Sequence, residues 1–127
     1  MSIISKKTIL MATIPQRQSK LLEIVSRLYP FVDELRIVFN NYQSIPNWVN
    51  NYPKIIWKLN TPDHYTCNAI WLMMNDVKGY IFTCDDDILY PSDYVNKMID
   101  KLEQYNRKVL LSMYGEICPR PFKDYLI

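Results

Sequence analysis

The feature that most constrains this chain is a short apolar segment that ends in three consecutive carboxylates. Residues 80–83, Tyr-Ile-Phe-Thr, follow Gly79 and have the aromatic and β-branched composition of a buried strand. Three aspartates occupy positions 85–87, and a helical pattern begins near Ser92. The sequence therefore predicts a buried strand that delivers acidic groups to its carboxyl end.

The spacing of the aspartates indicates a cation site. In an extended backbone successive side chains point to opposite faces, so Asp85 and Asp87 share one face and Asp86 lies on the other. Two unit charges about 4 Å apart repel by ~4 kcal/mol at an effective dielectric constant near 20. Carboxylates suit Mg²⁺ or Mn²⁺, and Mg²⁺ is usually held by one or two of them together with substrate phosphates. The alternative is a solvated acidic turn in front of a helix.

Two stretches resemble one family of enzymes. Residues 80–95 resemble the DxD region of glycosyltransferases with the GT-A fold, in the broad family-2-like group. Residues 11–17, Met-Ala-Thr-Ile-Pro-Gln-Arg, resemble the first strand and the nucleotide-facing loop of the same group. The order of strand, acids, Tyr-Pro and helix, preceded by the Thr-Ile-Pro-x-Arg loop, carries the resemblance over most of the chain.

The resemblance implies a metal-dependent glycosyltransferase, or its donor-binding portion. Such an enzyme transfers a sugar from a nucleotide-diphosphate sugar to an acceptor, here a glycan or a lipid-linked glycan. It implies that Asp87 reaches Mn²⁺ or Mg²⁺ and has a catalytic role, and that Asp85 binds the donor ribose or metal-bound water. The candidate donor-binding residues are Thr13, Ile14, Pro15, Arg17, Tyr42, Asp85 and Asp86.

Three of these residues have a plain structural alternative. Arg17 is either a nucleotide contact or a surface charge beside the first helix. Tyr42 follows the second predicted strand, where a packing role competes with a role in the nucleobase pocket. Asp86 belongs to the acidic run, but we expect its replacement to change binding little, because its side chain points to the other face of the strand.

The acceptor side of the site departs from the family pattern. Enzymes of this group usually carry an acidic base and a histidine metal ligand after the fifth strand, where this chain reads Met-Tyr-Gly-Glu at 113–116. Glu116 is either a candidate catalytic base or a solvated surface glutamate. Either the metal is held without a histidine, or the chain is a minimal or truncated enzyme.

Strand and helix signals alternate along the chain. Apolar runs of strand length occupy residues 8–13, 35–39, 54–59, 80–83 and 108–113; helical spacing occupies 18–28, 69–77 and a stretch from Ser92 or Asp93 to Asn106. This alternation predicts an α/β fold in a single domain, 1–127: a mainly parallel, Rossmann-like sheet flanked by helices. The 13–17 loop and the acidic run both follow strands, so they can converge on one ligand.

Composition excludes several classes of protein. The formal charge is +2 with dispersed Lys and Arg, which does not favour nucleic-acid binding, and two glycines leave no room for a glycine-rich phosphate cradle. No stretch approaches the ~20 apolar residues of a membrane span, so we expect a cytoplasmic protein with no transmembrane segment. Cys67, Cys84 and Cys118 form no Cys-x-x-Cys pair, and Cys84 is expected to be a buried structural thiol.

Two other functions remain open at this point. One is a non-catalytic module that binds a nucleotide or a divalent metal. The other is a metal-dependent phosphohydrolase, for which Asp63 and His64 are the suggestive additional pair.

Overall fold

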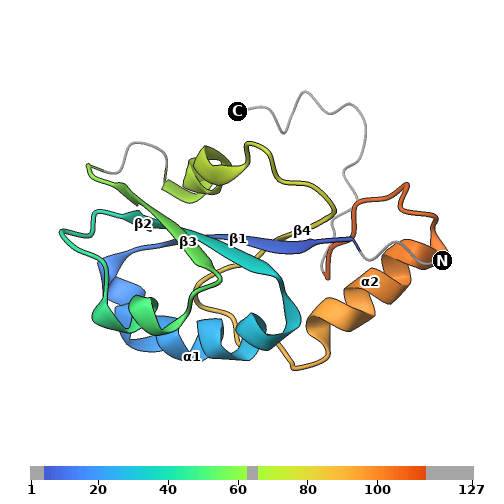
Figure 1. Ribbon diagram of the computed structural model, residues 1–127, viewed down its shortest axis with the longest axis horizontal. Coiled ribbons are helices and arrows are strands. Elements are labelled where there is room, and N and C mark those ends of the chain that lie inside the picture. The colour runs from blue at the N-terminus through green and yellow to red at the C-terminus, as the bar shows by residue number, and fades with distance from the viewer. Residues whose placement is uncertain (1–4, 63–65, 114–127) are drawn as a thin grey trace, which may run out of the picture.

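Four parallel strands form the central sheet of the protein in the computed structural model, which describes residues 5–62 and 66–113 (Figure 1). The strands are β1 (Lys7–Thr13), β2 (Glu34–Asn40), β3 (Ile55–Asn60) and β4 (Tyr80–Thr83). They lie in the order β3-β2-β1-β4, and every neighbouring pair is parallel. The predicted α/β fold with a parallel sheet flanked by helices is therefore confirmed.

Strand β1 is central and is buried on both faces, as is typical of parallel sheets covered by helices. Ile9 and Met11 contribute to the main hydrophobic core, and Leu10 between them is equally buried. Because successive side chains alternate, Leu10 faces the opposite side of the sheet. The continuous apolar run that predicted this strand thus reflects burial from two directions.

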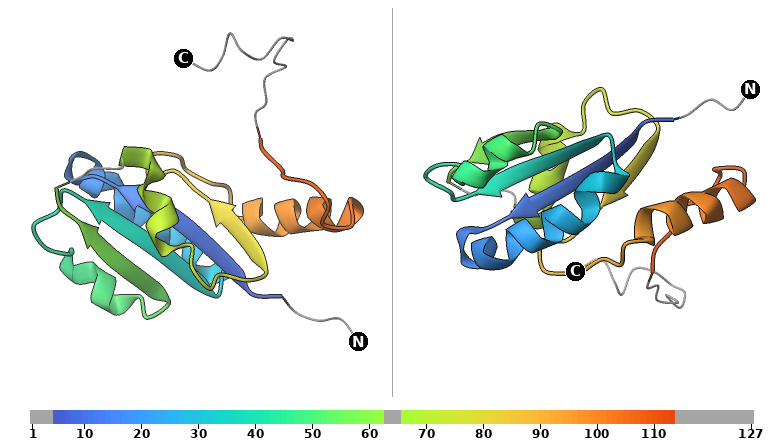
Figure 2. Two further views of the ribbon diagram at one scale, coloured as in Figure 1. Left: turned by 90° about the horizontal axis from the view of Figure 1, so that it is seen from above. Right: turned by 60° about the horizontal axis from the view of Figure 1, so that its bottom comes forward.

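Two α-helices pack on one face of the sheet, α1 (Gln18–Leu28) and α2 (Tyr94–Gln104), which Figure 2 shows from below. Helix α1 buries Leu21, Ile24, Val25 and Leu28, while Leu22 is half-exposed. Helix α2 follows Asp93, whose carboxylate pairs with Lys97 at 2.8 Å instead of capping the helix. No helix within the described ranges is both long and apolar enough to cross a membrane.

The opposite face is covered by a short 3₁₀ helix, η4 (Thr66–Met73), instead of the α-helix predicted over 69–77. Arg36 of β2 fixes the end of η4, because its Nη1 donates to the carbonyl oxygens of Met73 and Asn75 at 3.0 and 3.2 Å. These carbonyls are bound by a side chain of the sheet and do not continue a helix. The predicted apolar spacing was right about burial at Ala69 but wrong about the type of helix.

Gly79 connects η4 to β4 at a point where no other residue fits. Its φ of +88° lies in the left-handed region, and a Cβ there would approach the Lys6 carbonyl oxygen to 2.3 Å. The next residue, Tyr80, donates its N–H to that same carbonyl at 2.8 Å and begins the pairing of β4 with β1. The glycine thus lets the two backbones approach closely enough to start the ladder.

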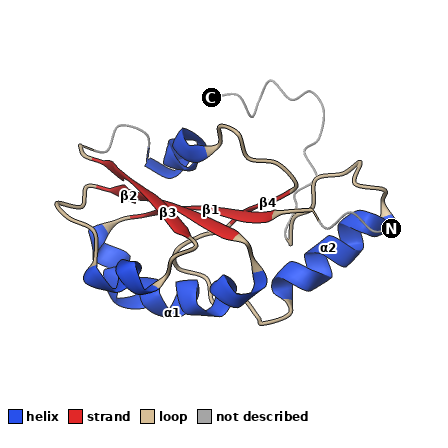
Figure 3. Cartoon of the chain, viewed as in Figure 1, coloured by secondary structure: helices blue, strands red, loops and turns tan. Residues whose placement is uncertain are grey.

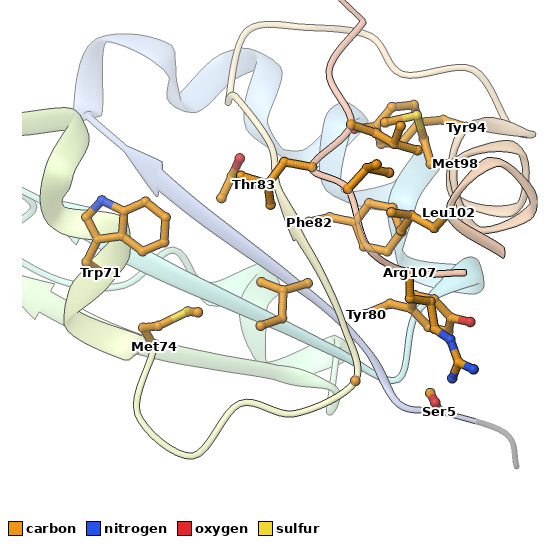
Figure 4. A pocket seen from close by; sticks show the side chains of 15 residues that line it. Ser5, Trp71, Met74, Tyr80, Phe82, Thr83, Tyr94, Met98, Leu102 and Arg107 are labelled. Atoms are coloured by element: carbon orange, nitrogen blue, oxygen red, sulfur yellow. The ribbon is translucent and has the colours of Figure 1, made fainter. Parts of the chain in front are cut away.

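The predicted fifth strand at 108–113 is wrong, because these residues are loop in the structure (Figure 3). Asn106 and Arg107 both have positive φ, and they turn the chain back after α2. Val109, Leu110 and Leu111 then line an apolar groove of about 650 Å³ along the free edge of β4 (Figure 4). These apolar residues line the same groove as β4 but form no strand, and Leu110 is fully exposed.

Candidate functional site

The strand order places a switch point between β1 and β4. The chain starts at β1, adds β2 and β3 on one side, and then returns to add β4 on the other side of β1. Helix α1, in the connection from β1 to β2, covers one face of the sheet, and η4, in the connection from β3 to β4, covers the other, so the strand order reverses between β1 and β4. Ligands of open α/β sheets bind at such points, beyond the carboxyl ends of the strands.

A cavity of about 540 Å³ lies at this point. Ala12, Thr13, Ile14 and Arg17 line it from the end of β1, and Cys84, Asp85 and Asp86 line it from the end of β4. Asn40 of β2 and Trp71 of η4 complete the wall. The two predicted segments do converge, within reach of one ligand.

Arg17 joins the two segments directly. It ends the single-turn helix η1 (Pro15–Arg17), and its Nη1 lies 2.7 Å from Asp86 Oδ1 and 3.1 Å from Asp87 Oδ2. The hydrogen bond with Asp86, followed by the charges of Asp86 and Asp87, raises the pKa of Arg17 further above its ordinary value. Arg17 is therefore a charged part of this cluster rather than an isolated surface residue.

Asp86 differs from what the extended-strand geometry predicted. Exposure alternates as expected, with Asp85 and Asp87 exposed and Asp86 only 4% exposed. However, β4 ends at Thr83 and the chain turns at 86–87, so Asp86 and Asp87 contact the same guanidinium. Among the described residues no group is hydrogen-bonded to Asp86 Oδ2. A buried oxygen without a partner carries a desolvation cost, and Asp86 lines the cavity, where a ligand could relieve that cost.

Tyr90 positions the acidic turn and was not predicted as a site residue. Its buried hydroxyl accepts the backbone N–H of Asp85 at 2.8 Å, and its ring lies 4.7 Å from the ring of Tyr94 at the start of α2. Burial raises the pKa of Tyr90, so the hydroxyl stays neutral. The signal in the sequence was the Tyr-Pro pair between the acids and the helix.

Cys84 is a buried free thiol, in agreement with the structural role expected from the sequence. Burial raises its pKa to about 12, which leaves it protonated at neutral pH. A thiol in that form is a poor nucleophile. His64, the single histidine of the sequence, lies outside the described residues.

Tyr42 both packs and lines a cavity. Its ring contacts Phe39 edge-on at a centroid distance of 5.0 Å, and its hydroxyl donates to the carbonyl oxygen of Ile14 at 3.1 Å. Burial raises the pKa of this hydroxyl. Tyr42 also lines a second hollow of about 520 Å³, together with Pro15 and Asn47. It therefore holds the 13–17 loop in place beside a space that a nucleobase could occupy.

The metal prediction stays a prediction. Within residues 5–62 and 66–113 no three His, Cys, Asp or Glu side chains form a group suited to a metal ion. The donor set nevertheless fits Mg²⁺ or Mn²⁺, because such ions need only one or two carboxylates when a diphosphate supplies further oxygens. Glu116, Asp63 and His64 lie outside the described residues, so the structure places neither the candidate base nor the phosphohydrolase pair.

Comparison of the sequence with protein-family models and with curated proteins gives no match. The described residues offer three features that bear on function: the switch point, the cavity, and the cluster formed by Arg17, Asp86 and Asp87.

Proposed function

We propose that this chain binds a nucleotide-diphosphate sugar with Mn²⁺ or Mg²⁺, and that it is a glycosyltransferase or the donor-binding portion of one. The observation that carries the proposal is the convergence of the 13–17 loop and the acidic turn on one cavity at the switch point. A site for a sugar-diphosphate donor needs carboxylate oxygens that can hold a cation and a neighbouring loop that can contact the nucleotide. The acidic turn and the 13–17 loop supply these two parts at one cavity.

The two hollows on either side of the 13–17 loop match the two parts of such a donor. Tyr42 and Pro15 line the outer hollow, which would take the nucleoside. Thr13 and Asp85 line the inner cavity, which would take the diphosphate and the sugar. Ile14, whose carbonyl is held by Tyr42, lines the inner cavity from the boundary between them.

The chemistry of transfer assigns a role to the acidic turn. The bound metal would neutralise the charge that develops on the diphosphate as the glycosidic bond breaks. Asp87, Asp85 and Asp86 are the carboxylates available to hold it, and Asp85 also offers an acceptor to the ribose hydroxyls. The acceptor would be a glycan or a lipid-linked glycan, and Trp71, 52% exposed at the cavity wall, offers a flat apolar surface to a sugar ring.

One observation favours a second candidate, a binding module without turnover. Apart from the two aspartates and Arg17, the described lining of the inner cavity carries no titratable side chain that could serve as a base for an acceptor hydroxyl, since Cys84 is held protonated. Product analysis separates the candidates. Sugar attached to an added acceptor indicates transfer, free sugar indicates hydrolysis, and binding with neither product indicates a module.

A thermal-shift panel of nucleoside diphosphates and their sugars, with and without Mn²⁺, tests the proposal. A ligand present at 100 times its dissociation constant stabilises the folded state by about 2.7 kcal/mol, which gives a clear shift. We expect at least one nucleotide sugar to stabilise the protein more with Mn²⁺ than without it. Asp87→Asn should remove the Mn²⁺-dependent part, and Asp100→Asn, an exposed carboxylate on α2, is the matched control. No shift with any nucleotide would reject the proposal.

A further inference from the structure

We propose that Arg17 holds the place of a divalent cation between Asp86 and Asp87, and that a cation bound there releases the guanidinium to bind the diphosphate. The second step rests on the proposed function, whereas the first concerns the cation alone. Arg17 would then couple the two ligands, because each one favours the same position of its side chain.

The contact geometry is that of one positive centre between two carboxylates. An arginine that binds a carboxylate strongly does so with two parallel N–H groups in a fork. Here a single nitrogen, Nη1, contacts Asp86 Oδ1 at 2.7 Å and Asp87 Oδ2 at 3.1 Å. A cation bound by the same two oxygens would occupy the space of that nitrogen. The arginine and the cation therefore compete.

Asp86 has a second carboxylate oxygen that Arg17 leaves unpaired and that a cation could bind. Its side chain is 6% exposed, and its second oxygen has no hydrogen-bond partner among the described residues. Mg²⁺ and Mn²⁺ take several oxygen ligands, and either oxygen of a carboxylate can serve as one of them. A cation at this position can thus reach an oxygen that is buried and otherwise unpaired.

The charge of the cluster favours an ion of charge +2. Three aspartates and one arginine leave a formal charge of −2 at the end of β4. An arginine guanidinium is always charged in a protein, so it must move as an ion. Its departure exposes the full charge of the three carboxylates to the incoming cation.

The exposed side chain of Arg17 can leave the two carboxylates and can instead point into the inner cavity. Its side chain is 45% exposed, and within the described residues its guanidinium has hydrogen bonds or ion pairs with Asp86 and Asp87 only. The pair with Asp87 is half-exposed and is screened by solvent, whereas Asp86 is buried, so the incoming cation must replace the contact that Asp86 loses when Arg17 leaves. Arg17 also lines the inner cavity, where the fork of a guanidinium can bind phosphate oxygens.

Titration calorimetry with Mn²⁺ alone tests the first step. We expect Arg17→Gln to bind Mn²⁺ about threefold to tenfold more tightly than the unmodified chain, since a competing charge is removed. Asp86→Asn and Asp87→Asn should each weaken Mn²⁺ binding more than Asp85→Asn does. Arg27→Gln is the matched control, because Arg27 is an exposed arginine paired with Glu23 on α1, and it should bind Mn²⁺ like the unmodified chain.

Titration with uridine diphosphate at saturating Mn²⁺ tests the second step. Arg17→Gln should weaken the nucleotide about tenfold, because one charge-assisted contact to phosphate is lost. The same substitution thus tightens one ligand and weakens the other. A residue that merely held the loop would weaken both.

The outcomes separate the inference from the proposed function. Unchanged or weaker Mn²⁺ binding by Arg17→Gln overturns the inference, even if nucleotides bind well. Tighter Mn²⁺ binding in a chain that binds no nucleotide supports the exchange at the acids and rejects the proposed function. If melting curves show that Arg17→Gln does not fold, Arg17→Lys replaces it: its single ammonium still competes with Mn²⁺ but lacks the fork, so Mn²⁺ binding should be unchanged and nucleotide binding weaker.

Discussion

The two faces of the sheet differ in how they are filled. On the face covered by α1, the side chains of Ile9, Leu21 and Ile37 are completely buried in one apolar core. On the face covered by η4, Trp71 is 52% exposed and Ile81 is 36% exposed. The first face is packed to stabilise the fold. The second is incompletely covered, and the inner cavity opens beside it.

Polar contacts hold the η4 face where apolar packing is thin. Arg36 bridges Glu34 at 3.2 Å and Asp76 at 3.1 Å, and Lys6 pairs with Glu34 at 2.7 Å. The pairs with Arg36 and Lys6 lower the pKa of Glu34 although burial opposes the shift. Directional contacts of this kind fix η4 at one place and leave the space beside it open.

The largest expected effect comes from the α1 face. Leu21→Ala should lower the free energy of unfolding by about 2–5 kcal/mol, because it removes a fully buried side chain and leaves a cavity. Leu22→Ala, one residue further along the same helix, is the control; Leu22 is half-exposed, and we expect a loss below about 1 kcal/mol. Urea denaturation measures both. Equal losses would contradict the assignment of this face as the core.

Arg36→Met tests the η4 face. Arg36 is 11% exposed, and its removal leaves Glu34 with one partner and two carbonyls of the η4 segment unbound. We expect a loss of about 2–3 kcal/mol. Arg27→Met removes an exposed pair within α1 and should cost less than about 0.5 kcal/mol. Hydrogen exchange should show faster exchange near η4 in Arg36→Met, with α1 unaffected.

The same difference explains how well the sequence predicted each region. Helix α1 was predicted within a residue of its observed bounds because burial on one side gives a clear period, and β4 because its aromatic and β-branched residues follow a glycine. The 69–77 and 108–113 segments failed, since their apolar residues line partly open surfaces, where periodicity does not distinguish helix, strand and loop.

The candidate site was predicted in its segments but not in its contacts. The rule that ligands bind beyond strand ends brought the 13–17 loop and the acidic run together. The alternation of side chains along a strand correctly predicted that the exposure of Asp86 differs from that of Asp85 and Asp87. It could not show that the chain turns after Thr83, which brings Asp86 and Asp87 to one arginine, or that Tyr90 supports the turn.

Cys84 gives a smaller effect that depends on pH. Its pKa is raised from 9.0 to about 12 by burial in the α1 face, so the folded state keeps a proton that the unfolded chain loses above pH 9. Stability should therefore fall as the pH rises from 9 toward 12, by about 1.4 kcal/mol at pH 10 for this group alone. Cys84→Ala should flatten the decline between pH 8 and 10 relative to the unmodified chain. Parallel curves would contradict the assigned shift. Buried tyrosines add a common background in both proteins.

The smallest effect on stability is expected at Trp71, and there the comparison is sharpest. Trp71→Ala should change the free energy of unfolding by less than about 1 kcal/mol, since half of the side chain already faces solvent. Trp57→Ala on the edge strand β3 is the matched control, because Trp57 is 46% exposed and is not part of the inner cavity wall. The two variants should melt alike but bind differently.

If the open face serves a ligand, Trp71→Ala should weaken binding of the best nucleotide sugar of the panel about fivefold, a loss of ~1 kcal/mol. Ligand-induced quenching of tryptophan fluorescence should persist in Trp57→Ala and largely disappear in Trp71→Ala. Equal binding by both variants would show that the thin packing of the η4 face has no part in binding, and that the cavity takes its ligand from the acidic turn alone.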